Sequence, residues 1–478
     1  MVGITGYGAY VPLYRLDKKV IDGRGEKAIC SFDEDSLTMA VEAINDCLKG
    51  KDRKEIDALY FGTTTSLYKE HLGATTIAMA SDLKENVYTA EFGNSLRAGT
   101  AALKAGIEAV KAGSTKNALV SASDCRLGPP GSLLERNMGD GSVAFLVGDT
   151  DVAVTFEGSY HVYNEIVDVW RNNGDSYVRS WEDRFAIEQG YMPSMQKAIA
   201  GLMETFDYKP SDFSKAVLYS PDARRSAQLG RRMGFDIENQ LQDPLIDVMG
   251  DTGAAAALML LVAALEAANP GDRILLASYG NGADAISLKV HRDIKKIRGQ
   301  GLGLKGHLSS KRLITDYLKY LKWRGIVPID RAAGPVASYS AVAAKREYDR
   351  NISLHGSRCM ACGYVQYPPQ RVCTKCHEKD QMEPYSFVGK KGRIFTYNLD
   401  YITPRAEVPV TTTEVDFEGG GRIQSYMTEV DPESISIGMP VEMTFRRYTL
   451  WEEIAQREGT YIYFWESKPI REPIKDEG

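Results

Sequence analysis

Four cysteines in the last third of the chain form two pairs whose spacing strongly limits the possible structures. Two residues separate Cys359 from Cys362 and Cys373 from Cys376, and ten residues lie between the pairs. Each pair can place two thiolates on one tight turn, where Gly363 suits the first turn, and together the pairs supply the tetrahedral sulfur ligands that Zn²⁺ prefers. Because sulfur fills all four positions, we expect a structural zinc ion and not a catalytic one.

The other cysteines do not indicate a disulfide framework. The chain has seven cysteines, an odd number, and four of them belong to the cluster. Two disulfides or four free thiols would be the alternative for the cluster, and a reducing compartment disfavours disulfides.

No basic stretch followed by an apolar run opens the chain, so we expect no signal peptide and a cytoplasmic protein.

Length and composition indicate a soluble globular protein with two or three domains. The chain has 478 residues, of which 43% are hydrophobic and 26% charged, and a net charge of −6. A single core rarely extends over this length. The most apolar stretch begins at Ala254, but it is short and contains Glu266, so we expect a buried helix and no membrane span.

Up to about Val290, short apolar stretches alternate with helical ones, a pattern typical of an α/β domain. The order of elements is similar in two halves that divide near residue 160. We expect strands at Val2–Ile4, Ala58–Phe61, Ala118–Ser121, Val143–Val147, Ala216–Tyr219, Arg273–Ser278 and Ala285–Val290. We expect helices at Asp35–Leu48, Ala98–Ala112, Gly190–Phe206 and Thr252–Ala268.

The rest of the chain divides into a helical connector, 291–350, a zinc ribbon, 351–380, and a small β domain with a C-terminal extension, 381–478. In the connector, Leu313, Tyr317 and Leu321 have helical spacing, and GPVASYS from Gly334 is typical of a linker. Four to five short strands with Gly and Pro turns favour an OB-type barrel. The strands expected there are Gly392–Tyr401, Val408–Asp416, Arg422–Val430 and Pro440–Arg446.

Zinc ribbons and OB barrels often bind nucleic acid, but this segment is acidic. From Arg358 to the end, 15 Lys and Arg stand against 19 Asp and Glu. Nucleic-acid binding rests on neutralised phosphates, so we expect no nucleic-acid partner.

Three stretches of this segment, CMACGYVQYPPQRVCTKC, GRIFTYNLDYI and DPESISIGMPVEMTF, resemble the zinc-ribbon/OB-fold proteins that accompany acyl-CoA thiolases. The resemblance covers about 120 residues. It implies a docking or substrate-bridging role beside an enzyme that acts on CoA esters.

Residues 1–290 resemble the thiolase superfamily, in particular the 3-hydroxy-3-methylglutaryl-CoA synthase branch related to ketoacyl synthase III. The motifs are GYGAYVPLYRL, DEDSLTMAVEAINDCL, FGNSLRAGTAALKAG, GDGSVAFLVGD, YKPSDFSKAVLYSPD and PGDRILLASYGNGADAISL. The resemblance implies a five-layered αβαβα fold with duplicated halves that is usually dimeric and handles acyl-CoA thioesters.

At the positions that carry the family's chemistry, this sequence departs from the pattern. That chemistry uses a thiolate to accept the acyl group, a general acid/base and a His or Asn that stabilises the enolate or oxyanion. Here Leu96 replaces the Cys, Thr64 the acidic Glu, Tyr219 the His, and Asp222 and Asp251 two Asn residues. Leu96 has no nucleophilic atom, so we expect no acyl-enzyme at this position.

Other polar residues in these segments have simpler interpretations. Ser95 is adjacent to Leu96, but no His is aligned to activate it. Cys125 follows a strand near the region where this fold builds its site. We expect it to serve packing, as most buried free cysteines do, with catalysis as the alternative. His71 and His161 occur in no motif.

Two function hypotheses follow. In the first, the chain is an acyl-CoA-binding subunit without acyl-enzyme chemistry that works with a partner thiolase. In the second, it is a CoA-ester C–C lyase or condensing enzyme in which Tyr219 and Asp251 transfer protons, whereas drift at a disused site would explain the same two residues without catalysis. The resemblance implies Arg224 as a contact to the CoA phosphates, with a solvated basic helix face as the alternative.

Overall fold

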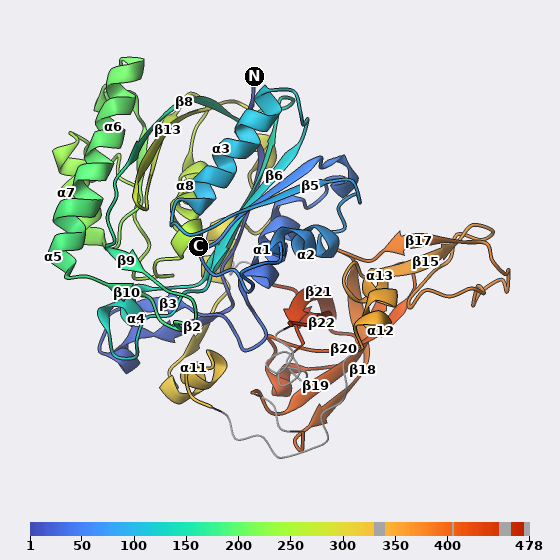
Figure 1. Ribbon diagram of the computed structural model, residues 1–478. Helices are drawn as coiled ribbons and strands as arrows, with labels where there is room; N and C mark the ends of the chain where they lie inside the picture. The colour runs from blue at the N-terminus through green and yellow to red at the C-terminus, as the bar shows by residue number, and fades with distance from the viewer. Residues whose placement is uncertain (329–339, 404–405, 449–459, 473–478) are drawn as a thin grey trace, which may run out of the picture.

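The first 290 residues form two sheets with helices between them and outside them, in the computed structural model of residues 1–328, 340–403, 406–448 and 460–472 (Figure 1). The first half contains a five-stranded sheet in the order β5-β4-β6-β7-β1. In it β4 is parallel to β5 and β6, and β7 is antiparallel to β6 and β1. These strands are β1 (Gly3–Tyr10), β4 (Ala58–Gly62), β5 (Tyr88–Phe92), β6 (Ala118–Asp124) and β7 (Gly141–Gly148).

The second half repeats this arrangement with four strands in the order β11-β12-β13-β8. As in the first half, a parallel pair, β11 and β12, continues into antiparallel neighbours. A short pairing of β1 with β8 joins the two sheets. These strands are β8 (Val154–Tyr163), β11 (Lys215–Leu218), β12 (Arg273–Tyr279) and β13 (Gly282–Val290). The duplication expected from the resemblance is confirmed.

Helices complete the five layers. The central layer contains α3 (Ala98–Lys111) and α8 (Ala256–Ala267), which contact each other and the two sheets. The outer layers contain α1 (Ser36–Cys47) and α2 (Gly73–Ala80) on one side and α6 (Met192–Phe206) and α7 (Ala223–Arg232) on the other (Figure 1). Since both sheets enclose α8, it is apolar on nearly every face, as expected for a buried helix. Among the described residues, no helix has the length and apolarity needed to cross a bilayer.

Short helices and strands pack around this core. Leu313, expected in a helix, lies in β14 (Arg312–Ile314), which pairs with β2 (Tyr14–Asp17), so that expectation was wrong; helical spacing alone does not exclude an edge strand. Tyr317 and Leu321 do lie in α11 (Tyr317–Trp323). The linker sequence at 334–339 lies outside the described residues. The remaining elements are β3 (Glu26–Ala28), β9 (Val169–Trp170), β10 (Arg179–Ser180), α4 (Leu133–Asn137), α5 (Asp183–Phe185), α9 (Ile294–Ile297), α10 (Gly303–Ser309), α12 (Ala341–Arg346) and α13 (Tyr348–Asn351).

The C-terminal part contains a three-stranded ribbon and a five-stranded, nearly closed sheet. The ribbon has the order β16-β15-β17, and the larger sheet has the order β20-β19-β18-β21-β22. A bridge between Met427 and Ser467 brings its two edges together. The expected zinc ribbon and small barrel are thus confirmed. The strands are β15 (His355–Cys359), β16 (Val365–Gln366), β17 (Met382–Ser386), β18 (Lys391–Asp400), β19 (Val410–Phe417), β20 (Arg422–Tyr426), β21 (Pro440–Arg447) and β22 (Tyr463–Pro469).

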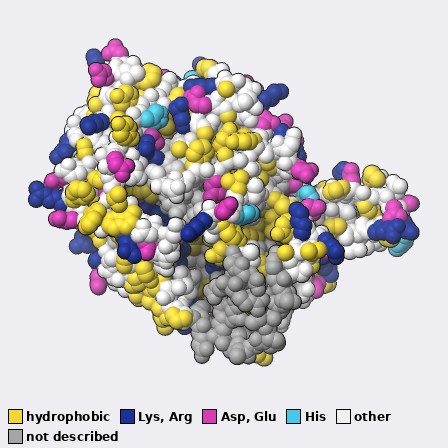
Figure 2. All heavy atoms as spheres, viewed as in Figure 1, with side chains coloured by type: hydrophobic (Ala, Val, Ile, Leu, Met, Phe, Trp, Pro, Cys, Tyr) yellow, Lys and Arg dark blue, Asp and Glu magenta, His cyan; other side chains and the backbone are white. Residues whose placement is uncertain are grey.

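The barrel packs against the outer layer that contains α1. One hydrophobic core includes Leu37 and Ile44 of α1 together with Phe445 and Trp465 of the barrel. The ribbon, in contrast, projects from the body of the molecule, and both acidic and basic side chains lie at its tip (Figure 2). The two domains therefore share a core, and the ribbon extends away from it.

Candidate functional site

The four cysteines converge in the ribbon as their spacing predicts. Their sulfur atoms all lie within 4.8 Å of one another. The Sγ atoms of Cys359 and Cys376 are 3.7 Å apart, and those of Cys362 and Cys373 are 3.6 Å apart. Gly363 adopts a φ of 74°, which a residue with a side chain rarely does. Backbone N–H groups of the second turn, chiefly that of Cys376, lower the pKa of Cys373 to about 6. A preformed set of four sulfur donors fits one structural zinc ion.

A cavity of about 1330 Å³ opens where several strands of the large domain end. Thr63 follows β4, Cys125 follows β6, Tyr219 follows β11, and Gly280 follows β12, and all four line the cavity. In α/β proteins, ligands bind at the carboxyl ends of the strands, where the loops after neighbouring strands converge. The volume exceeds the roughly 300–1,000 Å³ of ordinary small-molecule pockets, so a long ligand can enter.

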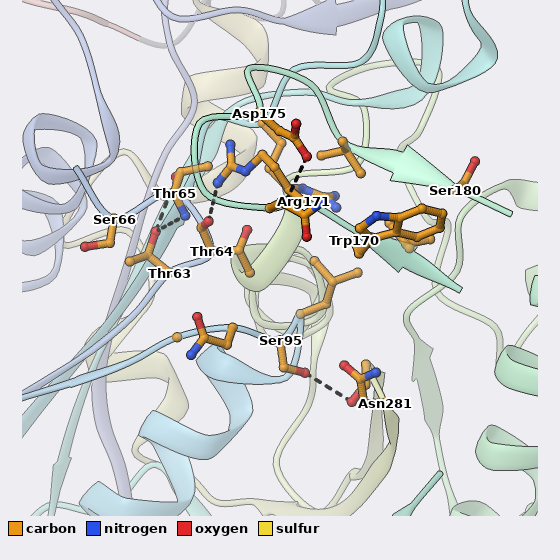
Figure 3. A pocket seen from close by; sticks show the side chains of 18 of the residues that line it. Thr63, Thr64, Thr65, Ser66, Ser95, Trp170, Arg171, Asp175, Ser180 and Asn281 are labelled. Carbon is orange, nitrogen blue, oxygen red and sulfur yellow. Dashed lines mark hydrogen bonds between the residues drawn. The ribbon is translucent and has the colours of Figure 1, made fainter. Parts of the chain in front are cut away.

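Leu96 lines this cavity just before the N-terminus of α3. The neighbouring Ser95 donates a hydrogen bond of 3.1 Å from its hydroxyl to the carbonyl oxygen of Gly280 (Figure 3). A side chain at position 280 would come within 2.6 Å of Ser95 Oγ, so glycine permits this close approach. The Ser95 hydroxyl is thus directed at backbone, as in a structural serine.

Thr64 lines the cavity and belongs to a hydroxyl cluster around Asp124. The hydroxyl groups of Thr63, Thr64 and Thr65 donate to the Asp124 carboxylate over 2.8–3.0 Å. The backbone N–H groups of Thr64 and Ala254 donate to it as well. Asp124 is fully buried, and these donors satisfy its charge. The cluster fixes the loop after β4, and Thr64 offers a hydroxyl group where the family has its acidic Glu.

Tyr219 and Asp251 lie together, although they are far apart in sequence. The Tyr219 hydroxyl donates to Asp251 Oδ2 over 3.0 Å, and Arg126 Nη2 donates to the same oxygen over 2.7 Å. All three residues are buried, and both Tyr219 and Arg126 line the cavity. Burial, reinforced by the Asp251 charge, raises the pKa of Tyr219 well above its ordinary value. Burial alone would lower the pKa of Arg126, but the charge of Asp251 raises it overall, so Arg126 stays cationic.

A second tyrosine–carboxylate pair borders the same cavity. The hydroxyl of Tyr279 donates a short hydrogen bond to Asp168, and both side chains are buried. Tyr191 packs edge-on against Tyr279 with ring centroids 5.5 Å apart and donates its hydroxyl to the Tyr219 carbonyl oxygen over 2.8 Å. Three buried tyrosines, Tyr191, Tyr219 and Tyr279, therefore line the same cavity as Leu96.

Cys125, expected to serve packing, lines the cavity and is half-buried. Its thiol lies 3.8 Å from Thr65 Oγ1. A hydrogen bond with the Cys30 thiol and, to a lesser extent, the charge of Arg324 lower the pKa of Cys125. Cys125 also packs against the hydrophobic core that includes Leu37, so the structure shows both the packing and the nearness to the site that the sequence indicated.

The other residues singled out from the sequence lie at the edge of the cavity or outside it. His71 is exposed on the cavity wall, and its ring packs edge-on against Tyr68. His161 does not line the cavity and contacts Asp284, 2.8 Å away. Asp222 caps α7. Arg224 is exposed in the first turn of that helix and does not line the cavity.

The sequence reasoning missed Asp124, Arg126, Asp168 and Tyr279. Asp124, Arg126 and Tyr279 occupy the end of a strand or the residues just after it, where parallel strands present side chains to a ligand. Polar residues at these ends are a signal that could have identified them. Asp168, which follows no strand directly, offered no comparable signal.

Comparisons with known proteins match both parts of the chain. The model of the ChsH2 rubredoxin-like zinc ribbon domain matches residues 350–383, and that of the ChsH2 C-terminal OB-fold domain matches 385–446. Hydroxymethylglutaryl-CoA synthase of Thermococcus sibiricus is 37% identical over 339 residues, which are 68% of this chain and 96% of that protein.

Two solved structures share the fold of the large domain at low sequence identity. A crystal structure of HMG-CoA synthase complexed with CoA has a TM-score of 0.61 and 20% identity, and the match covers 67% of this chain and 89% of that one. The 3-oxoacyl-[acyl-carrier-protein] synthase III of Aquifex aeolicus has a TM-score of 0.55 and 19% identity, and covers 60% and 100%. These comparisons confirm both resemblances drawn from the sequence motifs.

Proposed function

Because the chain belongs to the hydroxymethylglutaryl-CoA synthase family, we propose that it binds an acyl-CoA thioester in its cavity without forming an acyl-enzyme at position 96. The observation that carries this proposal is Leu96 on the cavity wall. A hydrocarbon side chain cannot attack a thioester. The large volume of the cavity supports retained binding of a long ligand.

In this proposal the chain acts as a homodimer together with a thiolase-type catalytic subunit, and it holds or presents the CoA ester. A chain of this family in which Leu96 and Thr64 replace the thiol and the acid fits such a subunit. Arg224, although outside the cavity, lies on the surface helix that follows Tyr219, so it is our candidate contact for phosphates that extend out of the pocket.

Calorimetry and intact-mass spectrometry together test this proposal. Acetyl-CoA and CoA should bind the purified chain, and the protein mass should remain unchanged after incubation with acetyl-CoA. A stable acetyl adduct at Ser95 or Cys125 would contradict the absence of acyl-enzyme chemistry. The absence of CoA binding, with or without a co-purified thiolase, would contradict the proposal as a whole.

A second candidate function is a CoA-ester C–C lyase or condensing enzyme that uses Tyr219 and Asp251. The contact that favours it is the 3.0 Å hydrogen bond from the Tyr219 hydroxyl to Asp251 beside the cavity. A phenol with a raised pKa keeps its proton at neutral pH, so Tyr219 could give that proton to an enolate as the C–C bond breaks. Arg126 would stabilise the negative charge that then lies on the pair.

We further propose that Cys359, Cys362, Cys373 and Cys376 hold one zinc ion. The cluster leaves no coordination position for a substrate, so this ion supplies folding energy to the ribbon and takes no part in the chemistry of the cavity.

A further inference from the structure

One side chain of the C-terminal domain reaches the cavity of the large domain. Tyr461, just before β22, lines the same cavity as Leu96 and Tyr219. Its backbone N–H donates to the hydroxyl of Tyr68 over 2.7 Å, and the two rings meet edge-on with centroids 5.6 Å apart. Tyr68 packs in turn against His71, with centroids 5.0 Å apart. Residues from two domains thus form one continuous aromatic wall.

Buried polar contacts hold the C-terminal domain in this position. Close to Tyr461, the hydroxyl of Tyr463 donates to Asp35, the N-cap of α1, over 2.9 Å. Lys468 of β22 donates to the carboxylate of Glu42 in α1, and both side chains are buried. Both contacts join two domains of one chain. Detaching the barrel would expose these polar groups to water together with the shared apolar core.

We infer that Tyr461, with Tyr68 and His71, is a direct contact for the bound CoA ester, so that the C-terminal domain completes the ligand site of its own chain. This inference rests on the proposed function. It assigns the barrel a part in ligand binding within its own chain, where the resemblance implied a docking or substrate-bridging role beside another enzyme. Aromatic rings offer large, rigid contact area to the uncharged parts of a ligand.

The test measures the Kd of acetyl-CoA and of free CoA by calorimetry with full-length variants. Tyr461→Ala should weaken acetyl-CoA binding by about fivefold, the scale of one lost aromatic contact. Tyr461→Phe keeps the ring and the backbone N–H, so its Kd should stay within about twofold of the wild type. Equal weakening for both ligands places the wall against the CoA part, and weakening for acetyl-CoA alone places it against the acyl part; either result supports the inference.

Tyr463→Phe is the matched control, because it removes an interdomain hydrogen bond close to Tyr461 but lies outside the cavity. Because the Lys468–Glu42 contact and the shared apolar core still dock the domain, its Kd should stay within about twofold of the wild type even if its melting temperature falls. If Tyr461→Ala does not fold, Tyr461→Leu provides the same measurement. Wild-type affinity in Tyr461→Ala and in Tyr461→Leu would overturn this inference and leave the proposed function intact. A wild-type protein that binds neither ligand would instead defeat the proposed function itself.

Discussion

The hydroxyl of Tyr219 lies 3.0 Å from Asp251 Oδ2, and Arg126 binds the same oxygen from another side. Oδ2 of this carboxylate therefore accepts from two side chains, while Oδ1 accepts from the backbone N–H of Gly253 over 2.9 Å. Such a group acts as a satisfied buried network or as a proton-transfer pair, and the two roles predict different effects of removing the hydroxyl.

Tyr219→Phe distinguishes these two roles, because it keeps the ring and removes only the hydroxyl. The proposed function predicts that turnover by the complex with its partner stays within a few-fold of the wild type. Catalysis by Tyr219 would instead cost about 10²-fold or more, the scale for losing a general acid or base.

Tyr191→Phe is the control for this measurement. It removes a neighbouring buried hydroxyl that donates to a backbone carbonyl, so it should cost on the order of 1 kcal/mol of stability and no turnover. A large turnover loss in Tyr219→Phe alone, with CoA binding intact, would establish the lyase or condensing function in place of the first proposal.

The zinc cluster predicts close to one zinc per chain in metal analysis. Cys373→Ser should release the metal and unfold the ribbon, because the remaining three thiolates no longer close the tetrahedron. Cys125→Ser, at the cavity, should retain the metal. A zinc content near zero in reduced wild-type protein would exclude the site.

Glu266 predicts a pH dependence of stability. Burial raises its pKa to about 7, although the N–H groups of Lys305 and Leu304 oppose this shift. A carboxyl whose folded pKa lies above its unfolded value holds its proton more tightly in the folded state, so stability falls as pH rises from about 4.5 to 7. Between pH 5 and 8 this loss amounts to on the order of 2 kcal/mol.

In Glu266→Gln no proton is exchanged at this position. Urea unfolding of both proteins at pH 5, 6.5 and 8 should give a stability difference that moves in favour of the variant by that amount as pH rises. Parallel pH profiles would show that Glu266 has an ordinary pKa.

The sequence predicted elements well where one local pattern determines them. The cysteine spacing predicted the ribbon cluster, and the apolar run around Leu260 predicted the buried central helix. The family motifs led to Tyr219 and Asp251, which the structure brings into contact.

Contacts between distant segments could not be predicted in the same way. Arg126 meets Asp251 only because the ends of two strands converge, and Tyr461 reaches the cavity only because the barrel docks on α1. Strand β8 was not expected, since its second part is largely exposed and lacks an apolar run. Tertiary packing decides all three features.

A fully buried ionic contact between the two domains is centred on Arg446. This fully buried residue of β21 lies 2.6 Å from Glu429, 3.4 Å from Glu34 and 3.9 Å from Asp33, where the last two belong to the large domain. Burial opposes the positive charge of Arg446, but Tyr10 and the surrounding carboxylates raise its pKa well above the ordinary value. The guanidinium is therefore one of the cations, together with Lys468 and Arg471, that neutralise a buried acidic cluster.

Arg446→Met should destabilise the protein by about 3–5 kcal/mol, because it leaves these carboxylates buried without the guanidinium that contacts them. Arg422→Met removes a pair with Asp416 that is largely exposed, so it should cost only about 0–1 kcal/mol. Adding Glu34→Gln to Arg446→Met should restore part of the loss, since it removes one uncompensated charge. Urea unfolding measures all three variants, and an Arg446→Met protein as stable as Arg422→Met would mean that the buried cluster contributes nothing to domain docking.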